Sequence, residues 1–455
     1  MVTAPGQAPP RPLPRTGAVS GVLEALDFFR DPAFARRRFE RHGDVFETAL
    51  LGQPIVFVRG GPAIADLLAA GDGVEGWWPE SVRQLLGSRS LANRTGPGHR
   101  ARRRVVGQLF AAAALRRYSP RIVELVNGLA AELLAAGEPL PLADRLRRFA
   151  FTVIATVVLG LEGDDREALF VDFEIWTRAL FSLPVAIPGS PFARALAARE
   201  RLLARLQRVL ERPAAGRGAL DLLAGGLDEA GIPLSDADLV EQLLLLLFAG
   251  YETTASSLAC LMRALLLQPE LEAWLRQELD ALPWPPAAAT APTAYEPQQA
   301  PRLDALTLEV LRLTPPVGGF FRRTTRPLTL AGVEVPAGRV VQVALAASNR
   351  YAAAPLGGSG LDLNAGNDLE TFRPQRHLAG DCGATLLPFG GGERVCLGKA
   401  LAELEMRLMV VGLLRQVRLE LAEGQNLELQ LLPSPTPRDG LLVRAAPGQE
   451  LCFSG

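Results

Sequence analysis

The chain has 455 residues, of which 48% are hydrophobic and 21% charged, so it can bury a sizeable core. Its formal net charge of −1 gives no bias toward nucleic acid or another polyanion. Four scattered cysteines form no Cys-x-x-Cys pair, which argues against a disulfide framework and fits a reducing cytoplasm. The apolar run 243–250 is too short to span a bilayer and no secretory signal pattern is visible, so we expect a soluble protein.

Strand, helix and turn signals in the first hundred residues predict a small β element followed by helices. The expected elements, in chain order, are a Pro-rich arm (1–20), a strand pair (45–51 and 54–58) turned at Gly52, a short helix (63–70) and an irregular stretch (71–98). Helical periodicity then dominates to about residue 280. We therefore expect a mainly α-helical fold.

A long helix is predicted over 236–267. Ser235 precedes it and Asp238 lies three residues further on, as in a capping box. Gly250 falls in its middle, where a glycine costs about 1 kcal/mol relative to alanine. This glycine should therefore have a packing or functional reason, such as opening a groove for something bound.

Two polar residues follow this glycine. Glu252 beside Thr253 places a titratable group next to a hydroxyl, which is the minimum for a proton relay. Ordinary helix packing is the alternative, because glycine, glutamate and threonine occur in the middle of many helices.

The last third of the chain adds a small β portion. The expected elements are an exposed Pro/Ala/Thr-rich connection (283–301), a helix (302–313), a small sheet (318–346) and a Gly/Asn/Asp-rich loop (353–370). Within the helix, Glu309 and Arg312 are three residues apart and share a face.

A Gly-rich loop, 389–398, contains a single cysteine, Cys396, and apolar residues at helical spacing follow it at once. At a helix N-terminus, unsatisfied N–H groups and the helix dipole favour a thiolate. The glycines remove side chains, so a large flat ligand could approach the sulfur closely. A cysteine presented this way suits a single axial metal bond, whereas an inert buried cysteine is the alternative.

This loop resembles the haem-binding signature of the cytochrome P450 superfamily, Phe-x-x-Gly-x-Arg-x-Cys-x-Gly. The matching positions are Phe389, Gly392, Arg394, Cys396 and Gly398. Residues 249–254 are similar to the superfamily's oxygen-activating motif, Ala/Gly-Gly-x-Asp/Glu-Thr-Thr/Ser. The resemblance implies a P450 fold and haem b (iron protoporphyrin IX) bound through a thiolate.

The resemblance also implies roles for individual residues. Thr253 and Glu252 would be catalytic, with Thr253 supporting oxygen activation and Glu252 bringing protons from solvent. Cys396 would be the metal ligand. The residues expected at the cofactor are His99, Arg103, Ala249, Gly250, Arg322, Phe389, Gly390, Arg394, Cys396 and Gly398. Glu309, Arg312 and Arg376 would form a structural network that holds the chain near the cysteine.

Four of these residues are cationic candidates for the haem propionates, which are costly to bury without such partners. They are His99, Arg103, Arg322 and Arg394. For the first two, the alternative is a solvated basic helix face that also includes Arg100, Arg102 and Arg104. For Arg322, the adjacent Arg323 is a competitor.

Apolar and aromatic stretches are candidates for a substrate wall. We select Trp77, Trp78 and Phe181, the last within the apolar segment 173–192. Residues 78–99 also resemble the retinoid-oxidising and related cyanobacterial branch of the superfamily. A retinoid- or carotenoid-derived substrate is the resulting hypothesis, with a fatty acid or a terpenoid as further options.

These features together predict a haem-thiolate monooxygenase whose catalytic domain spans 21–455. It would insert one atom of O2 into a hydrophobic small molecule. Electrons would come from a separate ferredoxin or flavodoxin-type donor and its reductase, because no flavin or iron–sulfur segment is visible. We expect a cytoplasmic monomer without a membrane span. The alternatives are a peroxide-driven peroxygenase, against which the pair Glu252 and Thr253 argues, and a non-catalytic haem protein.

Overall fold

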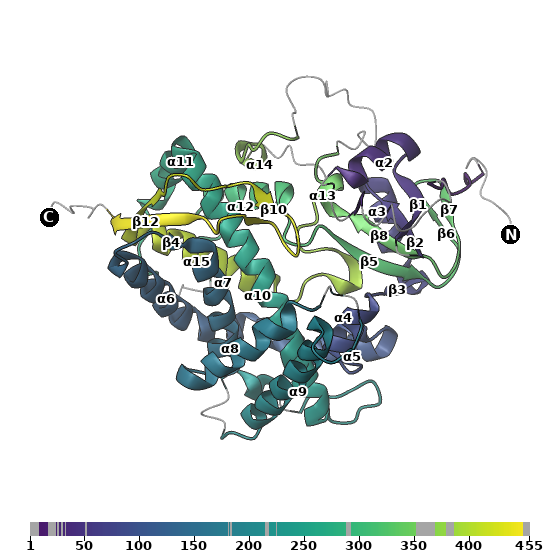
Figure 1. The fold of residues 1–455 in the computed structure, drawn as a ribbon, viewed down its shortest axis with the longest axis horizontal. Coiled ribbons are helices and arrows are strands. Elements are labelled where there is room, and N and C mark those ends of the chain that lie inside the picture. The colour runs from purple at the N-terminus through teal and green to yellow at the C-terminus, as the bar shows by residue number, and fades with distance from the viewer. Residues whose placement is uncertain are drawn as a thin grey trace. The chain divides into compact units, whose positions relative to one another are not determined.

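The computed structural model describes residues 9–16, 24, 27–28, 31, 33–50, 52–180, 182, 184–213, 218–223, 225–287, 293–351, 369–378 and 386–448. The chain divides into two compact units (Figure 1). We call Met1–Trp77 with Val317–Cys396 the sheet unit, and Trp78–Pro316 with Leu397–Gly455 the helical unit.

A five-stranded sheet organises the sheet unit. Its strands, in spatial order, are β1 (Val45–Leu50), β2 (Gln53–Val58), β8 (Val340–Ala344), β5 (Gly319–Thr324) and β3 (Val74–Gly76). The β2–β8 pair is parallel and the other pairs are antiparallel. The predicted strand pair is therefore in the same sheet as β5 and β8, the first and last strands of the predicted sheet over 318–346, whereas residues 328–335 between them form a separate two-stranded sheet.

Both faces of this sheet are covered, which explains its long apolar strands. On one face, Val56, Val58 and Val341 lie in a cluster with α3 (Gly61–Ala69) and the hairpin of β6 (Leu328–Leu330) and β7 (Val333–Val335). On the other face, Phe46 and Phe57 pack on α2 (Phe34–His42). The elements of this unit beyond the sheet are α2 (Phe34–His42), α3 (Gly61–Ala69), η1 (Gly71–Gly73), β6 (Leu328–Leu330), β7 (Val333–Val335), α13 (Leu345–Ser348), α14 (Gln375–Leu378) and η8 (Gly392–Arg394).

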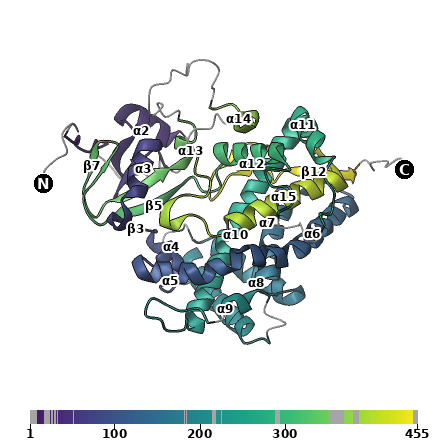
Figure 2. The same ribbon diagram turned by 180° about the vertical axis from the view of Figure 1, so that it is seen from behind.

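The helical unit holds most of the described α-helices, including all of those longer than nine residues, seen from two sides in Figures 1 and 2. They are α4 (Glu80–Leu86), α5 (Gly96–Gly107), α6 (Ala112–Ala135), α7 (Leu142–Val153), α8 (Gly163–Thr177), α9 (Pro191–Leu210), α10 (Asp236–Leu267), α11 (Pro269–Leu279), α12 (Pro301–Leu313) and α15 (Lys399–Gln416). Short 3₁₀ or π turns are η2 (Leu91–Asn93), η3 (Gln108–Phe110), η4 (Ile154–Val158) and η6 (Leu220–Leu223). Two small sheets contain β4 (Leu140–Pro141), β12 (Leu442–Pro447) and β9 (Val417–Leu421), and β10 (Leu429–Gln430) and β11 (Thr436–Pro437).

Helix α10 is the core helix of this unit, and it packs against α7, α9, α12 and α15. Among the described residues it is the one helix long and apolar enough to cross a membrane by length and composition. However, 67% of its most apolar 18-residue stretch is buried inside the protein. Its apolarity is therefore accounted for by packing. The Ser235 Oγ accepts a hydrogen bond from the Asp238 N–H at 3.2 Å, so the predicted N-cap is confirmed.

Two local expectations differ from the structure, and a third falls mostly on residues that the structure does not describe. The stretch 71–98 contains the strand β3 and the helix α4, which lacks a clear periodic pattern because it is only seven residues long. The connection 283–301 is not wholly exposed, since Tyr295 is 2% exposed and donates its hydroxyl to the carbonyl of Pro283. Most of 353–370 lies outside the described residues.

Helix α15, which begins three residues after Cys396, packs closely on α6 at Gly412. A Cβ at Gly412 would lie 2.4 Å from Val126 Cγ1 and 2.6 Å from Trp284 Cζ2. The lack of a side chain at this position therefore allows the two helices to approach.

Replacing Gly412 by alanine is expected to lower the free energy of unfolding by about 1–3 kcal/mol, because the added methyl overpacks this contact. The matched control is Gly128→Ala on α6, where nothing in the described part of the chain lies within 4 Å of the added methyl. The control should gain up to about 1 kcal/mol from the helix propensity of alanine. Urea unfolding followed by circular dichroism measures both, and equal stability of the two variants would contradict the close packing.

Candidate functional site

The loop before α15 presents Cys396 on a tight turn. The Cys396 N–H donates to the Phe389 carbonyl at 2.9 Å, and Gly390 and Gly392 adopt φ of +72° and +67°. These are left-handed conformations that favour glycine. The Cys396 residue is exposed, so the turn leaves its sulfur accessible.

Potential metal-ligating side chains do not cluster around Cys396 in the part of the chain that the structure describes. No group of three or more His, Cys, Asp or Glu side chains that could hold a metal occurs in the described ranges. An accessible cysteine can supply one bond to a metal whose other ligands come from a cofactor. The structure places Gly398 immediately before α15, as the residue that precedes its first turn.

Two arginines of the sheet unit lie close together. Gly76 of β3 pairs with Arg322 of β5, and a Cβ at Gly76 would lie 2.3 Å from the Arg394 Cζ. Gly76 thus forms a cradle for the guanidinium of Arg394. Burial, and then the charge of Arg394, lower the pKa of Arg322 to about 10. Two such neighbouring cations favour binding of an anion.

Of the two adjacent arginines, Arg322 is the one beside Arg394. Arg323 points elsewhere, and its Nε donates to Glu75 Oε1 at 2.7 Å. The alternation of side chains along β5 puts these neighbours on opposite faces. Gly76 was missed from the sequence, because its role depends on a strand pairing between segments almost 250 residues apart.

The centre of α10 has one accessible face in an otherwise buried helix. Ala249 is exposed and Glu252 and Thr253 are partly exposed, whereas Tyr251 and Thr254 are buried. The Thr253 hydroxyl donates to the Ala249 carbonyl at 2.7 Å. The predicted acid and alcohol are therefore both accessible, on the same stretch of helix.

Packing against α7 and the first residue of the following η4 fixes this orientation, through three contacts with the centre of α10. Arg147 Nη2 lies 3.3 Å from Glu252 Oε1, and the rings of Phe151 and Tyr251 are 6.3 Å apart. A Cβ at Gly250 would lie 3.1 Å from Ile154. The mid-helix glycine therefore has a packing reason, and on this side the expected groove is filled by an isoleucine.

Tyr251 anchors the same turn to α8. Its hydroxyl donates to Glu174 Oε1 at 2.9 Å, and its ring packs edge-on against Phe173 with centroids 5.1 Å apart. Phe173 and Trp176 are fully buried, so these two members of the predicted substrate wall belong to the helix core.

The predicted basic helix α5 is not a uniformly solvated face. His99 is 3% exposed and Arg103 is partly buried, whereas Arg100 and Arg104 are exposed. Arg102 is also buried, and its guanidinium bonds Glu229 Oε2 at 2.6 Å and Asp238 Oδ1 at 3.0 Å. The capping box is thus incomplete, because the Asp238 carboxylate is turned toward Arg102 and the Ser235 hydroxyl.

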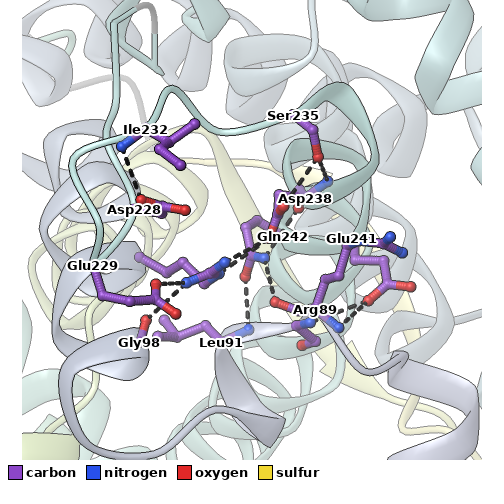
Figure 3. Close-up of polar contacts among 12 residues, drawn as sticks. Arg89, Leu91, Gly98, Asp228, Glu229, Ile232, Ser235, Asp238, Glu241 and Gln242 are labelled. Carbon is purple, nitrogen blue, oxygen red and sulfur yellow. Dashed lines mark hydrogen bonds and ion pairs between the residues drawn. The ribbon is translucent and has the colours of Figure 1, made fainter.

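The segment that leads into α5 is held by the first turns of α10 (Figure 3). Glu241 accepts hydrogen bonds from the N–H groups of Arg89 and Ser90 at 2.7 and 3.1 Å. The amide of Gln242 bonds the Leu91 N–H at 2.7 Å and the Arg89 carbonyl at 2.8 Å. These buried polar contacts fix the chain that carries His99 and Arg103 relative to α10.

A glycine makes room for part of this cluster. Gly87 has φ of +90°, and a Cβ there would lie 2.3 Å from both Arg199 and Glu241, whose ion pair is 2.7 Å long. Any side chain at Gly87 would therefore displace the pair.

The predicted substrate residues have different surroundings. Trp77 packs edge-on against Phe321 with centroids 5.3 Å apart, and Trp78 is partly buried. Phe181 lies outside the described residues. Their assignment to a substrate wall stays a prediction.

The predicted structural network is present in part. Glu309 and Arg312 of α12 form an ion pair with N–O distances of 2.8 and 2.9 Å, and both side chains are almost fully buried. Arg376 of the sheet unit is 3% exposed and donates to the Thr371 carbonyl at 2.9 Å. The joining of all three residues remains a prediction.

Comparison with known proteins finds relatives over nearly the whole chain. A family model described as Cytochrome P450 matches residues 9–453. Cytochrome P450 120 of Synechocystis sp. is 34% identical, over 98% of this chain and 99% of that protein. Cytochrome P450 26C1 of Homo sapiens is 33% identical, over 92% of this chain and 86% of that protein.

Solved structures are similar too. One described as retinoic acid bound cyanobacterial CYP120A1 has a TM-score of 0.84 at 33% identity, and covers 96% of this chain and 99% of its own. A cytochrome P450 described as CYP102L1 has a TM-score of 0.80 at 22% identity, over 97% and 100% of the two chains, which shows the fold alone. The expected mainly α-helical fold with a smaller β portion is thereby confirmed.

Breaking the buried pair of α12 is expected to be costly. Glu309→Gln should lower the free energy of unfolding by about 3–5 kcal/mol, because it leaves the Arg312 charge buried without its carboxylate. The control, Glu272→Gln, removes the carboxylate of a partly exposed i,i+4 pair with Arg276 and should cost less than about 0.5 kcal/mol. Urea titration measures both, and a Glu309→Gln variant within 1 kcal/mol of the parent would contradict a structural role.

Proposed function

Since this chain belongs to the cytochrome P450 family, whose members bind haem b and act as monooxygenases, we propose that Cys396 is its iron ligand and that a retinoid is its substrate. The observation that carries the ligand assignment is the accessible cysteine on a glycine turn. The residues present fit the cofactor in two further respects. Two neighbouring arginines of the sheet unit suit its carboxylates, and in the helical unit one face of α10 is accessible at residues 249–253.

The bound haem would supply the oxygen chemistry, in which one atom of O2 enters the substrate and the other leaves as water. Cys396 would act as a thiolate. The positive end of the helix dipole at the N-terminus of α15, which begins three residues later, favours this negative charge. Arg322, Arg394, His99 and Arg103 would pair with the two propionates. Each pair would offset the cost of removing a charge from water.

The α10 motif would serve proton transfer. The Thr253 hydroxyl, now donated to the Ala249 carbonyl, would offer its oxygen as an acceptor and its proton as a donor near the reacting oxygen. Glu252, which is partly exposed, would exchange protons with solvent. Gly250 and Ala249 would leave room for the cofactor on the accessible side of the helix.

A retinoid substrate is supported by two observations. Residues 78–99 resemble the retinoid-oxidising branch, and a solved structure of 33% identity is described as holding retinoic acid. A fatty acid or a terpenoid is the alternative. The electron donor would be a separate ferredoxin or flavodoxin-type protein with its reductase, and we expect a cytoplasmic monomer.

An electron donor with an acidic surface could dock on exposed basic residues of α5 and α15, but not every basic residue of these two helices is available for such a contact. Arg102 is buried against two carboxylates, and burial lowers the pKa of Arg407, which has acidic neighbours. Arg100 and Arg104 of α5 and Lys399 of α15 remain as exposed cations.

The iron ligand is tested by the absorption of the reduced protein under carbon monoxide. The parent should show the red-displaced band typical of a thiolate ligand, and Cys396→Ala should lose it. The control is Cys260→Ala, which removes a buried thiol of α10 that bonds the Pro435 carbonyl. Survival of the band in Cys396→Ala would disprove the assignment.

The substrate class is tested by titrating the ferric protein with retinoic acid, with palmitic acid and geraniol as comparison ligands. Retinoic acid should shift the haem absorption at the lowest concentration, because its polyene fills an apolar pocket and its carboxylate needs a polar contact. A ferredoxin and its reductase should then yield a product one oxygen atom heavier. If retinoic acid shifts the haem absorption at no concentration tested, a retinoid substrate is excluded. If hydrogen peroxide alone supports the same turnover as the ferredoxin and its reductase, the peroxygenase alternative is favoured.

A further inference from the structure

We propose that Arg147 is a positioning residue for Glu252, and that the cleft beside Arg147 is the route by which water brings protons to that carboxylate. This role rests on the function proposed above for Glu252 and Thr253, and it identifies how their supply of protons would be maintained. All of the residues involved belong to the helical unit.

Arg147 joins an exposed carboxylate to a more sheltered one. Its Nη2 lies 3.3 Å from Glu252 Oε1, and its Nη1 lies 3.4 Å from Asp144 Oδ1. The side chain of Asp144 is 62% exposed, that of Arg147 26% and that of Glu252 18%. The three charges therefore form a chain that leads from open solvent to the accessible face of α10.

Two of these three charged side chains, Asp144 and Arg147, line a cleft of about 430 Å³. Its lining includes Pro141 of β4, Asp144 and Arg147 of α7, and Gln430, Ser434 and Arg438 from the β10–β11 region. A cavity of this size and polarity can hold several waters, each with polar partners. Arg147 lines this cleft and also pairs with Glu252, so water held beside Arg147 would be separated from that carboxylate by a single side chain.

The charge of Arg147 defines what it can do. Burial lowers the pKa of this guanidinium, but the charge of Glu252 raises it, and the net pKa lies above its usual value. Arg147 therefore stays charged and does not itself deliver a proton. It holds the carboxylate in place, while its remaining N–H groups can orient water.

The reaction needs such a supply. Each substrate RH consumes O2, two electrons and two protons and yields ROH and water. The electrons come from the donor protein and the protons from solvent. Glu252 would take each proton from water in the cleft and pass it on toward Thr253, so it returns to its starting state after every transfer.

The experiment compares Arg147→Met, Arg147→Lys and Asp144→Asn with the control Arg145→Met in the haem-loaded protein. Arg145 lies on the same helix and pairs with Glu132 at 3.0 Å, so its loss also removes one ion pair. With retinoic acid, a ferredoxin and its reductase, Arg147→Met should lower product per NADPH consumed, by up to about a hundredfold. The solvent isotope effect on product formation should rise. Arg147→Lys should recover part of the loss, and Asp144→Asn should show a smaller one.

A second measurement does not depend on turnover. Thermal unfolding of the ferric protein is compared for Arg147→Met, Glu252→Gln and the double variant. Because the two side chains are in contact, the shifts in Tm should not add, whereas those of Arg145→Met and Glu252→Gln should. Additive shifts for Arg147 and Glu252 would overturn the positioning role.

The outcomes separate the two levels of proposal. If Glu252→Gln keeps the parental product yield and isotope effect, the function proposed for Glu252 fails. If Glu252→Gln is impaired while Arg147→Met behaves like Arg145→Met, only the role of Arg147 and its cleft fails. Reduced product yield and an increased isotope effect in both Glu252→Gln and Arg147→Met support the route.

Discussion

The packing of α7 on α10 is the contact on which the site in the helical unit depends. A helix as apolar as α10 is buried over most of its surface, and something must keep its functional turn accessible. Ile154 fills the space over Gly250, and Tyr251 is held by Phe151 and Glu174. With these two positions committed to packing, the helix cannot rotate, and Glu252 and Thr253 remain on the accessible side.

The second constraint is the treatment of buried charge. Arg102 and the pair Glu309–Arg312 are sheltered from water, and each cation meets a carboxylate within 3.1 Å. Arg322 differs, because its neighbour is another arginine and its pKa is lowered. Buried charges are usually paired with opposite ones, so a like-charged neighbour is consistent with the role proposed for Arg322 at a carboxylate of the cofactor.

Local signals in the sequence predicted where helices and turns lie better than they predicted which distant side chains contact one another. Ser235 and the apolar spacing that follows gave both ends of α10, and the glycines around Cys396 gave the turn. The sequence does not reveal that Arg102 turns toward Glu229, because that contact joins residues 127 positions apart. Gly76 was missed for the same reason. Arg147 gave no usable signal either, because it is one of several charged residues of α7, and only the structure shows that it pairs with Glu252.

Lys399 has a practical consequence that follows from the composition of the chain. It is the only lysine among 455 residues, it is 54% exposed, and it lies in the first turn of α15, three residues after the proposed iron ligand. Apart from the terminal amine, an amine-directed reagent would therefore meet a single reactive side chain. An electrode tether or a fluorescent reporter attached there would have the same position in every molecule, at the start of the helix that follows the cysteine.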